Sequence, residues 1–350
     1  MCSREKFIDV ARGLAIIFIV LGHTIVHSSN SFLLFKLLYS FHVVLFFIIS
    51  GYTFSFENNK NFLLFIKKKF KSIMIPYFIW AFIYLVPYII LGSTVSDELN
   101  VQADFNLKIL ISNIFYGIGS NSSLKQNSSL WFLPALFMMK IIYYKLIKIS
   151  DKSKNKTLIV LLVSIILMVL CSNFNFYLPW GINTALTLGV FYYIGWILKN
   201  KLDFLSFNNI YFFVFLLIGL ISAFCNKTVS CIDFSYGNVF FMFFSGLFLS
   251  MCVLKLSKII NSNFCLEYIG KNTMGILIFH KLIILIFQTK LGYISKLILN
   301  SNFAIELLIS LFATGISILF SLIISKMILY KASFLLGKNY TRKQGGIYGH

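Results

Sequence analysis

The first apolar segment of the chain, residues 7–27, is interrupted by three ionisable side chains, those of Asp9, Arg12 and His23, and ends at a fourth, His27. On an α-helix the eleven steps from Arg12 to His23 turn about 1100° and rise about 16 Å, so both side chains lie on one face. Asp9 lies one turn before Arg12, where we expect it to position the guanidinium through an ion pair. Ionisable groups inside a membrane span are costly and usually face a cavity in which they act. We therefore expect a functional site along this face.

Three of the five histidines, His23, His42 and His280, fall within apolar segments. An imidazole titrates near neutrality and can therefore remove a proton from a hydroxyl group as that group attacks an acyl carbon. A single intramembrane histidine is often only a hydrogen-bond partner in helix packing, but three of them with an arginine in line favour a catalytic site. The sequence shows no Ser-His-Asp elbow, zinc signature or glycine-rich phosphate loop. This favours direct transfer onto an acceptor, without a metal and without a covalent enzyme intermediate.

The composition defines the class of protein that must position these residues. Hydrophobic residues make up 59% of the 350 residues and charged residues only 12%, and the mean hydropathy is +0.86. These values exclude a soluble globular protein and predict an all-α polytopic membrane protein with about ten transmembrane helices. We expect residues 1–330 to form one membrane domain and residues 331–350 a short basic tail. The predicted spans are residues 7–27, 33–55, 73–92, 130–149, 157–173, 183–198, 209–225, 236–254, 272–289 and 303–326.

The distribution of lysine and arginine predicts the orientation of these spans. With a cytoplasmic N-terminus, 23 of the basic residues fall in cytoplasmic segments and six in outer segments, while Lys140 and Lys281 lie within spans. This bias places both termini in the cytoplasm and the protein in the cell (cytoplasmic, inner) membrane. The net charge of +20 therefore reflects topology and not nucleic-acid binding. A basic inner face also suits anionic lipids of the bilayer and phosphorylated ligands.

Two groups of residues on the predicted cytoplasmic side are candidate ligand-binding groups. The first is a lysine cluster ahead of Pro76, for which ordinary positive-inside anchoring and a cationic seat for a phosphate-bearing ligand both remain open. The second is Lys271 and Asn272 at the start of the ninth span, with His280 about 12 Å further along the helix. Lys281 is rotated from His280 by about 100°. The lysine cluster consists of Lys67, Lys68, Lys69 and Lys71.

The outer segments suggest two further features. The longest of them, residues 92–129, could cap the outer mouth of a site, and within it residues 105–116 are apolar enough for a short interfacial or re-entrant helix. Cys225 and Cys231 fall in one outer loop, where they could pair in an oxidising compartment or remain free thiols.

Five segments resemble, in order, the successive signatures of the acyltransferase 3 family and are most similar to its branch that contains fucose 4-O-acetylase. They are IDVARGLAIIFIVLGH, FHVVLFFIISGY, KKKFKSIMIPYFIW, LWFLPALF and IGKNTMGILIFH, which extend from Ile8 to His280. The resemblance implies an integral-membrane O-acyltransferase. Such an enzyme moves an acyl group, usually acetyl, from cytoplasmic acyl-CoA to a hydroxyl of an extracytoplasmic cell-surface glycan or its lipid-linked precursor.

The resemblance also implies roles for individual residues. The family's pattern of Arg, ten residues and His falls on Arg12 and His23, with His23 as the expected base. The histidine of the second helix falls on His42, and the C-terminal motif falls on Asn272 and His280. We expect His42 or His280 to orient the acceptor or stabilise the oxyanion. The phosphates of acetyl-CoA are expected at Arg12, Lys271 or the lysine cluster. In the family this basic stretch commonly contains arginine, whereas here its basic residues are all lysine.

A second class of protein, a lipid-linked glycan flippase or small-solute transporter, fits the composition and the number of spans. Such proteins tend to have repeated halves, and the sequence shows no convincing internal repeat. The bias toward Ile, Asn, Lys and Phe is compatible with an AT-rich bacterial genome. The sequence leaves open the acceptor sugar, the acyl group and whether the chain forms a homo-oligomer.

Overall fold

The structure, a computed structural model, describes residues 5–25, 31–56, 61–89, 106–117, 124, 127–174, 177–200, 207–290 and 302–338. Within these ranges the chain is helical apart from its turns and one isolated bridge between Ser230 and Ser235. Seven helices are long and apolar enough to cross a membrane, and two bent pairs raise the number to nine if each pair is one span. The predicted all-α polytopic membrane fold is confirmed. The number of ten spans and the cytoplasmic termini remain predictions.

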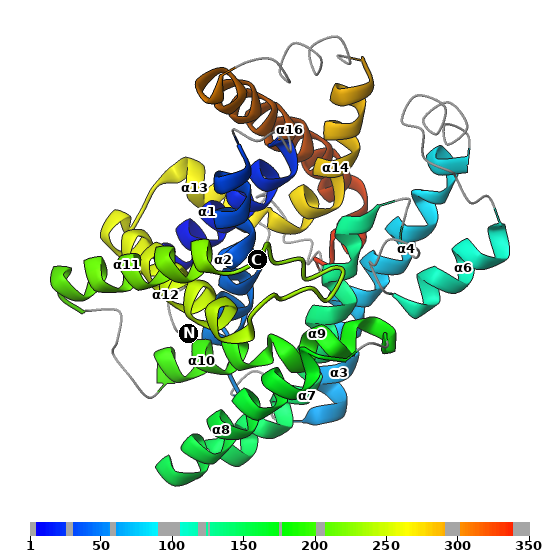
Figure 1. The fold of residues 1–350 in the computed structure, drawn as a ribbon. Coiled ribbons are helices and arrows are strands. Elements are labelled where there is room, and N and C mark those ends of the chain that lie inside the picture. Colours follow the sequence, from blue (N-terminus) through cyan, green and yellow to red (C-terminus); the bar gives the residue numbers. More distant parts are fainter. Residues whose placement is uncertain are drawn as a thin grey trace.

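The helices follow one another with short breaks (Figure 1). The long ones are α1 (Lys6–Thr24), α2 (Phe32–Tyr52), α7 (Phe132–Ser150), α8 (Lys154–Cys171), α11 (Asn209–Cys225), α12 (Val239–Ile260), α14 (Thr273–Lys290) and α16 (Phe303–Ala332). The shorter elements are α3 (Phe62–Lys69), η1 (Phe70–Met74), α4 (Ile75–Ile83), α6 (Leu107–Tyr116), η2 (Ser128–Trp131), η3 (Pro179–Gly181), α9 (Ile182–Thr187), α10 (Gly189–Asn200), α13 (Phe264–Lys271) and η5 (Ser333–Leu336).

The predicted spans differ from the helices mainly where a helix is continued or broken. The third span begins earlier than expected, because α3, the π-helical η1 and α4 run on as one apolar segment, Phe62–Ile89. The sixth is broken between α9 and α10 by a bend of 57°, and the ninth is preceded by α13 at a bend of 84°. The short helix expected at residues 105–116 is α6. The other predicted spans each correspond to one long helix.

Many of the helices begin where a polar side chain caps the first turn. Asparagine is well suited to this position because its side-chain oxygen accepts hydrogen bonds from backbone N–H groups that have no partner within the helix. Asn61, for example, accepts from the N–H groups of Leu63 and Leu64 at the start of α3. The abundance of asparagine between apolar segments therefore determines where helices start. The capping residues are Asn61, Asn106, Asn127, Ser153, Asn208, Asn238, Asn263 and Asn302.

Helix α1 lies at the centre of the bundle and packs against α2, α12, α13, α14 and α16 (Figure 1). Its contact with α13 is unusually close. A Cβ atom built on Gly13 would lie 2.3 Å from the carbonyl oxygen of Leu266, and one on Gly270 would lie 1.9 Å from that of Asp9. Small residues allow helix backbones in a membrane to meet in this way. The backbone that carries Asp9 and Arg12 is therefore held in place by α13.

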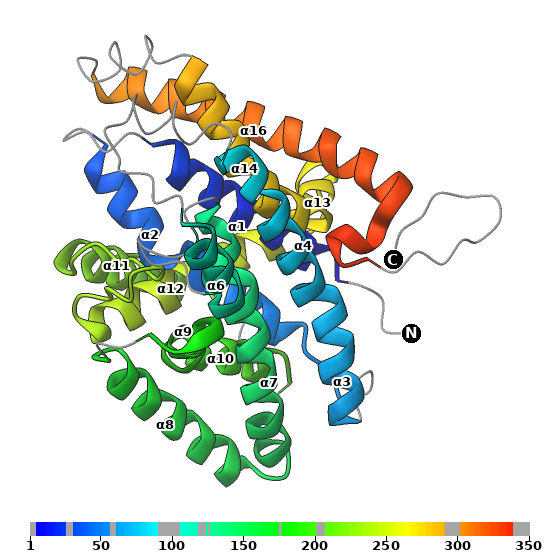
Figure 2. The same cartoon turned by 90° about the vertical axis from the view of Figure 1, so that its right-hand side faces the viewer.

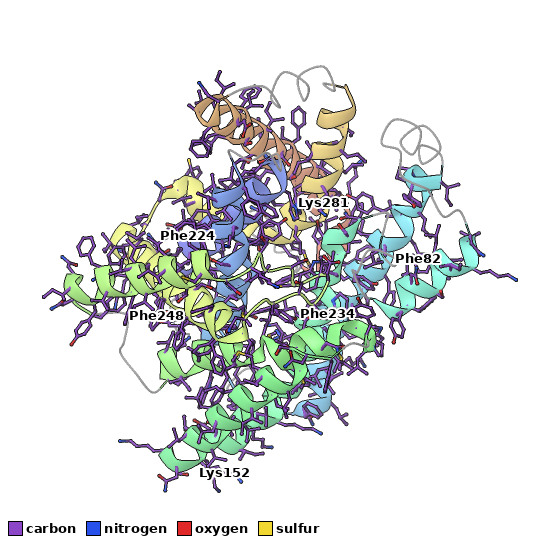
Figure 3. All side chains as sticks on the ribbon, in the orientation of Figure 1. Phe82, Lys152, Phe224, Phe234, Phe248 and Lys281 are labelled. Carbon is purple, nitrogen blue, oxygen red and sulfur yellow. The ribbon has the colours of Figure 1, made fainter. Side chains whose placement is uncertain are left out.

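Helices α2 and α10 cross equally closely. A Cβ atom on Gly51 would lie 1.8 Å from the carbonyl oxygen of Tyr192, and one on Gly195 would lie 2.0 Å from that of Ile48. Helices α7 and α8 form a hairpin that projects at one end of the molecule, whereas α14 and α16 lie at the opposite end (Figure 2). Lys152, in the turn of that hairpin, lies far from Lys281 of α14 (Figure 3).

The first residues of the predicted tail pack against the bundle. The indole N–H of Trp80 donates a hydrogen bond of 2.8 Å to the carbonyl oxygen of Leu335, and Leu336 is buried. Gly337 has a φ of +68° and lies against the backbone of Ser72. Residues 339–350 of the tail lie outside the described residues. The segment from Ser333 to Lys338 therefore belongs to the folded domain.

Cys225 and Cys231 are free thiols, so the alternative of a disulfide between them is wrong. Cys225 is exposed, whereas Cys231 is buried. Burial raises the pKa of the Cys231 thiol to about 12, because a thiolate is poorly solvated there. A protonated, buried thiol is a poor nucleophile and is inert toward disulfide exchange.

The predicted orientation can be tested with two exposed cysteines, Cys225 at the end of α11 and Cys265 in α13. In variants that keep one of these cysteines each, a membrane-impermeant maleimide added to intact cells should label Cys225 and not Cys265. Cys265 should react only after permeabilisation, because α13 follows a segment predicted to be cytoplasmic. Labelling of Cys265 in intact cells would reverse the orientation.

The close contact between α1 and α13 predicts a specific sensitivity to added side chains. Gly270→Ala should destabilise the protein by about 1–3 kcal/mol, since its methyl group would meet a backbone carbonyl that cannot easily move. The midpoint of thermal unfolding in detergent measures the effect. Gly315→Ala in α16 is the matched control, because a Cβ atom there has no neighbour within 4 Å. An equal midpoint for both variants would contradict the prediction.

Candidate functional site

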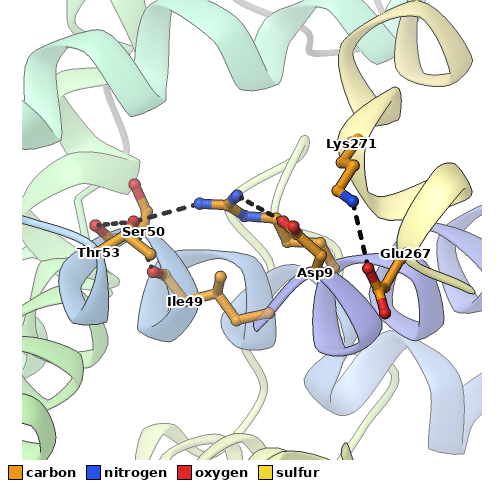
Figure 4. Close-up of polar contacts among 7 residues, drawn as sticks. Asp9, Ile49, Ser50, Thr53, Glu267 and Lys271 are labelled. Carbon is orange, nitrogen blue, oxygen red and sulfur yellow. Dashed lines mark hydrogen bonds and ion pairs between the residues drawn. The ribbon is translucent and has the colours of Figure 1, made fainter. Parts of the chain in front are cut away.

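The ion pair expected between Asp9 and Arg12 is present on α1. Nη1 of Arg12 lies 3.3 Å from Oδ1 of Asp9, and Nη2 donates to Oγ1 of Thr53 at 3.4 Å. Figure 4 shows Asp9 and Thr53 on either side of this guanidinium, with Thr53 in turn donating to the carbonyl oxygen of Ile49. The Asp9 side chain is 2% exposed and that of Arg12 is 26% exposed. The carboxylate thus belongs to the interior, while part of the guanidinium is open to a cavity.

This cavity has a volume of about 330 Å³ and lies between helices from distant parts of the sequence. Its polar lining consists of Arg12, Ser50, Thr53, Lys69, Lys140 and Thr273. Its apolar lining consists of Ile16, Ile19, Phe46, Ile49, Phe54, Ile73, Phe132, Leu133, Leu136, Met274 and Leu277. An amphipathic cavity of this kind, mostly apolar with a few converging polar groups, is typical of a small-molecule site.

On three helices, the face that lines the cavity leads to a histidine further along the same helix. The stripe on α1 continues from Ile19 to His23, four residues further, and the stripe on α14 continues from Leu277 to His280, three residues further. On α2, which runs in the opposite direction, Phe46 lies four residues after His42. Residues three or four apart share a helix face. All three histidines therefore lie one turn beyond the cavity lining, on the side away from Arg12.

The histidines of α1 and α14 are neighbours, with ring centroids 5.3 Å apart for His23 and His280. Tyr39 of α2 joins the third histidine to them. Its hydroxyl group lies 3.3 Å from Nδ1 of His23, and its ring centroid is 4.8 Å from that of His42. Gly22 leaves room for this ring, since a Cβ atom there would lie 3.1 Å from it. The structure thus brings His23, His42 and His280 into one cluster.

Hydrogen bonds to backbone carbonyls orient two of these rings. Nδ1 of His42 lies 2.5 Å from the carbonyl oxygen of Leu38, and Nδ1 of His280 lies 2.8 Å from that of Ile276. A carbonyl oxygen only accepts, so Nδ1 carries the proton in both rings and Nε2 of each neutral ring is an acceptor. His23 differs, because its Nδ1 faces a hydroxyl group that can either donate or accept.

The turn η2 lies against α14 beside the histidine cluster. Ser129 Oγ lies 3.4 Å from Nε2 of His280, and Ser128 Oγ accepts a hydrogen bond from Nζ of Lys281. The amide of Asn127 donates to the carbonyl oxygen of Ile278 at 3.0 Å. These contacts fix η2 to α14 at the end of the site opposite Arg12.

Only one member of the lysine cluster reaches the cavity. Lys69 lines it, with Nζ 5.6 Å from the centroid of the Phe65 ring, whereas the other three lysines of the cluster are exposed. The exposed members are Lys67, Lys68 and Lys71. The sequence could not distinguish these four positions, because the distinction depends on which face of α3 packs against α7.

Lys271 and Asn272 lie near the cavity but are not part of its lining. Nζ of Lys271 is 3.2 Å from Oε2 of Glu267, and the amide of Asn272 donates to the carbonyl oxygen of Tyr268. Oδ1 of Asn272 also accepts from Nζ of Lys338. The next residue, Thr273, does line the cavity. The expected roles of Lys271 and Asn272 in donor binding therefore receive no support from these contacts and remain predictions.

Several residues at the site have no role predicted from the sequence. Lys140 of α7 lines the cavity and donates a hydrogen bond of 2.5 Å to Ser50 Oγ of α2. Tyr39 and Ser129 contact histidines. The position of Lys140 within an apolar span was a usable signal, whereas Tyr39 and Ser129 belong to residue types too common to stand out. Within the described part of the chain, no group of three or more His, Cys, Asp or Glu residues could hold a metal ion.

A comparison with protein families finds that a family model described as an acyltransferase domain (Acyl_transf_3) matches residues 5–326, nearly the whole chain. Neither a curated protein nor a solved structure matches the chain significantly. The match covers the cavity and the three histidines of the cluster. The resemblance to the acyltransferase 3 family is therefore confirmed, while similarity to the fucose 4-O-acetylase branch remains a prediction.

Proposed function

We propose, because this chain belongs to the acyltransferase 3 family, that it is a membrane O-acyltransferase whose donor occupies the cavity and whose acceptor reaches the histidine cluster. Membership in the family supports a membrane acyltransferase. The acyl-CoA donor, the glycan acceptor and the histidine base are the finer parts of the proposal. One observation carries them: the cavity has cations among its lining residues, and the faces of three helices that line it lead, one turn further on, to three clustered histidines.

The cavity suits a donor that has a phosphate group at one end and an acyl group at the other. Guanidinium and ammonium groups of Arg12 and Lys69 would hold phosphate oxygens, and the apolar walls would guide the arm that carries the acyl group. Acyl-CoA has this design, with phosphates separated from the thioester by a pantetheine arm. The rise of about 16 Å from Arg12 to His23 then positions the thioester near the imidazole.

The proposed chemistry is a direct transfer. His23 removes the proton from the acceptor hydroxyl, the hydroxyl oxygen forms a bond to the thioester carbon, and the C–S bond breaks as the tetrahedral intermediate collapses. The departing thiolate takes the proton from the histidine and leaves as the CoA thiol. Because Nε2 of neutral His42 and of neutral His280 is an acceptor, these rings suit orientation of the hydroxyl better than donation to the oxyanion.

The acceptor is proposed to be a hydroxyl of an extracytoplasmic cell-surface glycan or its lipid-linked precursor, and the transferred group to be acetyl. Support for this part comes from the resemblance of the five sequence segments and from the predicted orientation, which places the Arg12 end of α1 on the cytoplasmic side. The histidine end then faces the outer half of the cell membrane, where η2 lies beside it.

The main test is transfer of radiolabelled acetyl from acetyl-CoA in isolated membranes. His23→Ala should lower the rate at least about 100-fold, the contribution expected of a general base. Lys152→Ala, at the tip of the α7–α8 hairpin, should leave it unchanged. Wild-type turnover in a His23→Ala variant that accumulates normally would remove His23 from catalysis. Movement of a glycan or solute without acceptor-dependent release of CoA thiol would favour a flippase or transporter.

A second test concerns the Arg12 end of the cavity. Removal of Arg12 alone would leave the buried Asp9 carboxylate without this cation, which destabilises proteins strongly. The double variant Asp9→Asn/Arg12→Met avoids this problem. It should raise the KM for acetyl-CoA about tenfold or more and affect kcat less, because the lost contact is to a part of the donor that does not react. An unchanged KM would contradict phosphate binding at Arg12.

Tyr39 is expected to act as a positioning residue for His23. If its hydroxyl oxygen accepts from Nδ1–H of His23, Nε2 becomes the basic nitrogen and the imidazolium is stabilised. Tyr39→Phe should lower kcat/KM by about 2- to 10-fold and shift the acid limb of its pH profile to lower pH. Tyr77→Phe, which removes a hydroxyl group that bonds the carbonyl oxygen of Ile114, is the control. An acid limb that stays in place would exclude this role.

A further inference from the structure

Lys140 is a partly buried cation in the membrane domain that neither the family match nor the sequence motifs assign to a function. It lies in the middle of α7, lines the cavity, and donates to the neutral hydroxyl group of Ser50. Its Nζ atom also lies 5.4 Å from the centroid of the Tyr192 ring. A hydroxyl dipole and an aromatic face stabilise an ammonium group but do not neutralise its charge.

The other charged residues that line the cavity with Lys140 are also positive. They are Lys69 and Arg12, which line the same cavity. Of the three, only Arg12 has a carboxylate partner in the described residues, and that partner is Asp9. Lys69 and Lys140 make no ion pair with any carboxylate of the described chain. Three cations thus converge on a space of about 330 Å³ with one carboxylate beside them.

Such an excess of positive charge is unfavourable in an empty apolar bundle. Like charges at close range repel one another, and the low polarity of the surroundings strengthens the repulsion. Ionisable residues inside membrane spans usually face the bundle interior or a cavity and mark the path or the site of a substrate or ion. Here a ligand with two or more negative charges would satisfy the three cations at once.

We infer that Lys140, together with Lys69 and Arg12, forms a binding site for a phosphate ester, and that the charge of Lys140, like that of Lys69, is compensated only when the ligand is bound. The inference rests on the proposed function, in which that ligand is the phosphate-bearing part of acyl-CoA. Ser50 holds the ammonium group in place and leaves its other two N–H donors available for phosphate oxygens.

This arrangement predicts opposite effects of one substitution on stability and on binding. Lys140→Met keeps the length and apolar character of the side chain but removes the charge. Without ligand it should melt a few degrees higher than the wild type, because the repulsion is relieved. Its affinity for CoA should be about tenfold or more lower, because a charge-assisted contact is lost.

The experiment uses the full-length protein in nanodiscs of phosphatidylcholine, with CoA as the probe and pantetheine, which lacks phosphate, as the uncharged probe. Binding is measured by calorimetry and stability by thermal unfolding with and without CoA. Lys140→Met should weaken CoA binding and gain less thermal stability from CoA, while any affinity for pantetheine stays the same. Lys148→Met, an exposed lysine two turns further along α7, should behave like the wild type in every measurement.

Several outcomes would overturn the inference while leaving the proposed function intact. One is wild-type CoA affinity in Lys140→Met, and another is an equal loss of affinity for CoA and pantetheine. If Lys140→Met fails to accumulate, Lys140→Gln, which retains a donor for Ser50, takes its place. Its affinities for CoA and pantetheine are then compared with those of the wild type in the same way. A wild-type protein that neither binds CoA nor transfers acetyl groups would instead reject the proposed function together with the inference.

A parallel measurement identifies the source of the phosphate group. In nanodiscs that contain phosphatidylglycerol, a lipid phosphate bound at Lys140 would weaken CoA binding to the wild type and not to Lys140→Met. If both proteins respond equally to the lipid, the site takes the soluble ligand. A site that binds lipid phosphate and no CoA would overturn its assignment to the donor.

Discussion

The guanidinium of Arg12 inside an apolar bundle determines much of the surrounding packing. An ionised group at this depth is stable only where the protein supplies polar partners, and Asp9 and Thr53 supply them from two helices. Thr53 reaches Arg12 because α2 ends there, and α2 is held by its close glycine contacts with α10. Asp9 is fixed in turn by Gly270 of α13. The glycines thus position a charged pair as well as permitting close packing.

The position of this pair gives the cavity its polarity. One end of the cavity carries cations, and three of the helices that line it, α1, α2 and α14, present apolar residues before a histidine follows about one turn further on. Because α1 and α14 run in one direction and α2 runs in the other, the same spacing of three or four residues converges on one cluster from three separate segments. Tyr39 and Ser129 then tie these rings to α2 and η2. A cation at one end and imidazoles at the other follow from helix geometry and need no elaborate loops.

Helix periodicity explains which parts of this arrangement the sequence could predict. The ion pair and the shared face of Arg12 and His23 depend on residues within one helix, so spacing alone was sufficient. The three histidines form a cluster only because three helices meet. The order of the motifs suggested that these residues belong to one site, but it could not show which of them are in contact. The lysine cluster was harder, because only Lys69 of four neighbours faces the cavity. Lys140 was identified as an intramembrane cation, but its proximity to Ser50 depends entirely on how α7 packs against α2.

The bend before α14 lies between two apolar helices, so the hydropathy of the sequence did not reveal it. Asn272, whose side chain bonds the carbonyl oxygen of Tyr268 and Nζ of Lys338, occupies a break of 84° between two apolar helices. The bend allows α14 to begin at Thr273, which lines the cavity near the cations. The first turn of a helix carries partial positive charge on its free N–H groups. A straight helix through this point would bury those groups in intrahelical hydrogen bonds. The break therefore adds a positive dipole end to the part of the cavity where Arg12, Lys69 and Lys140 already converge.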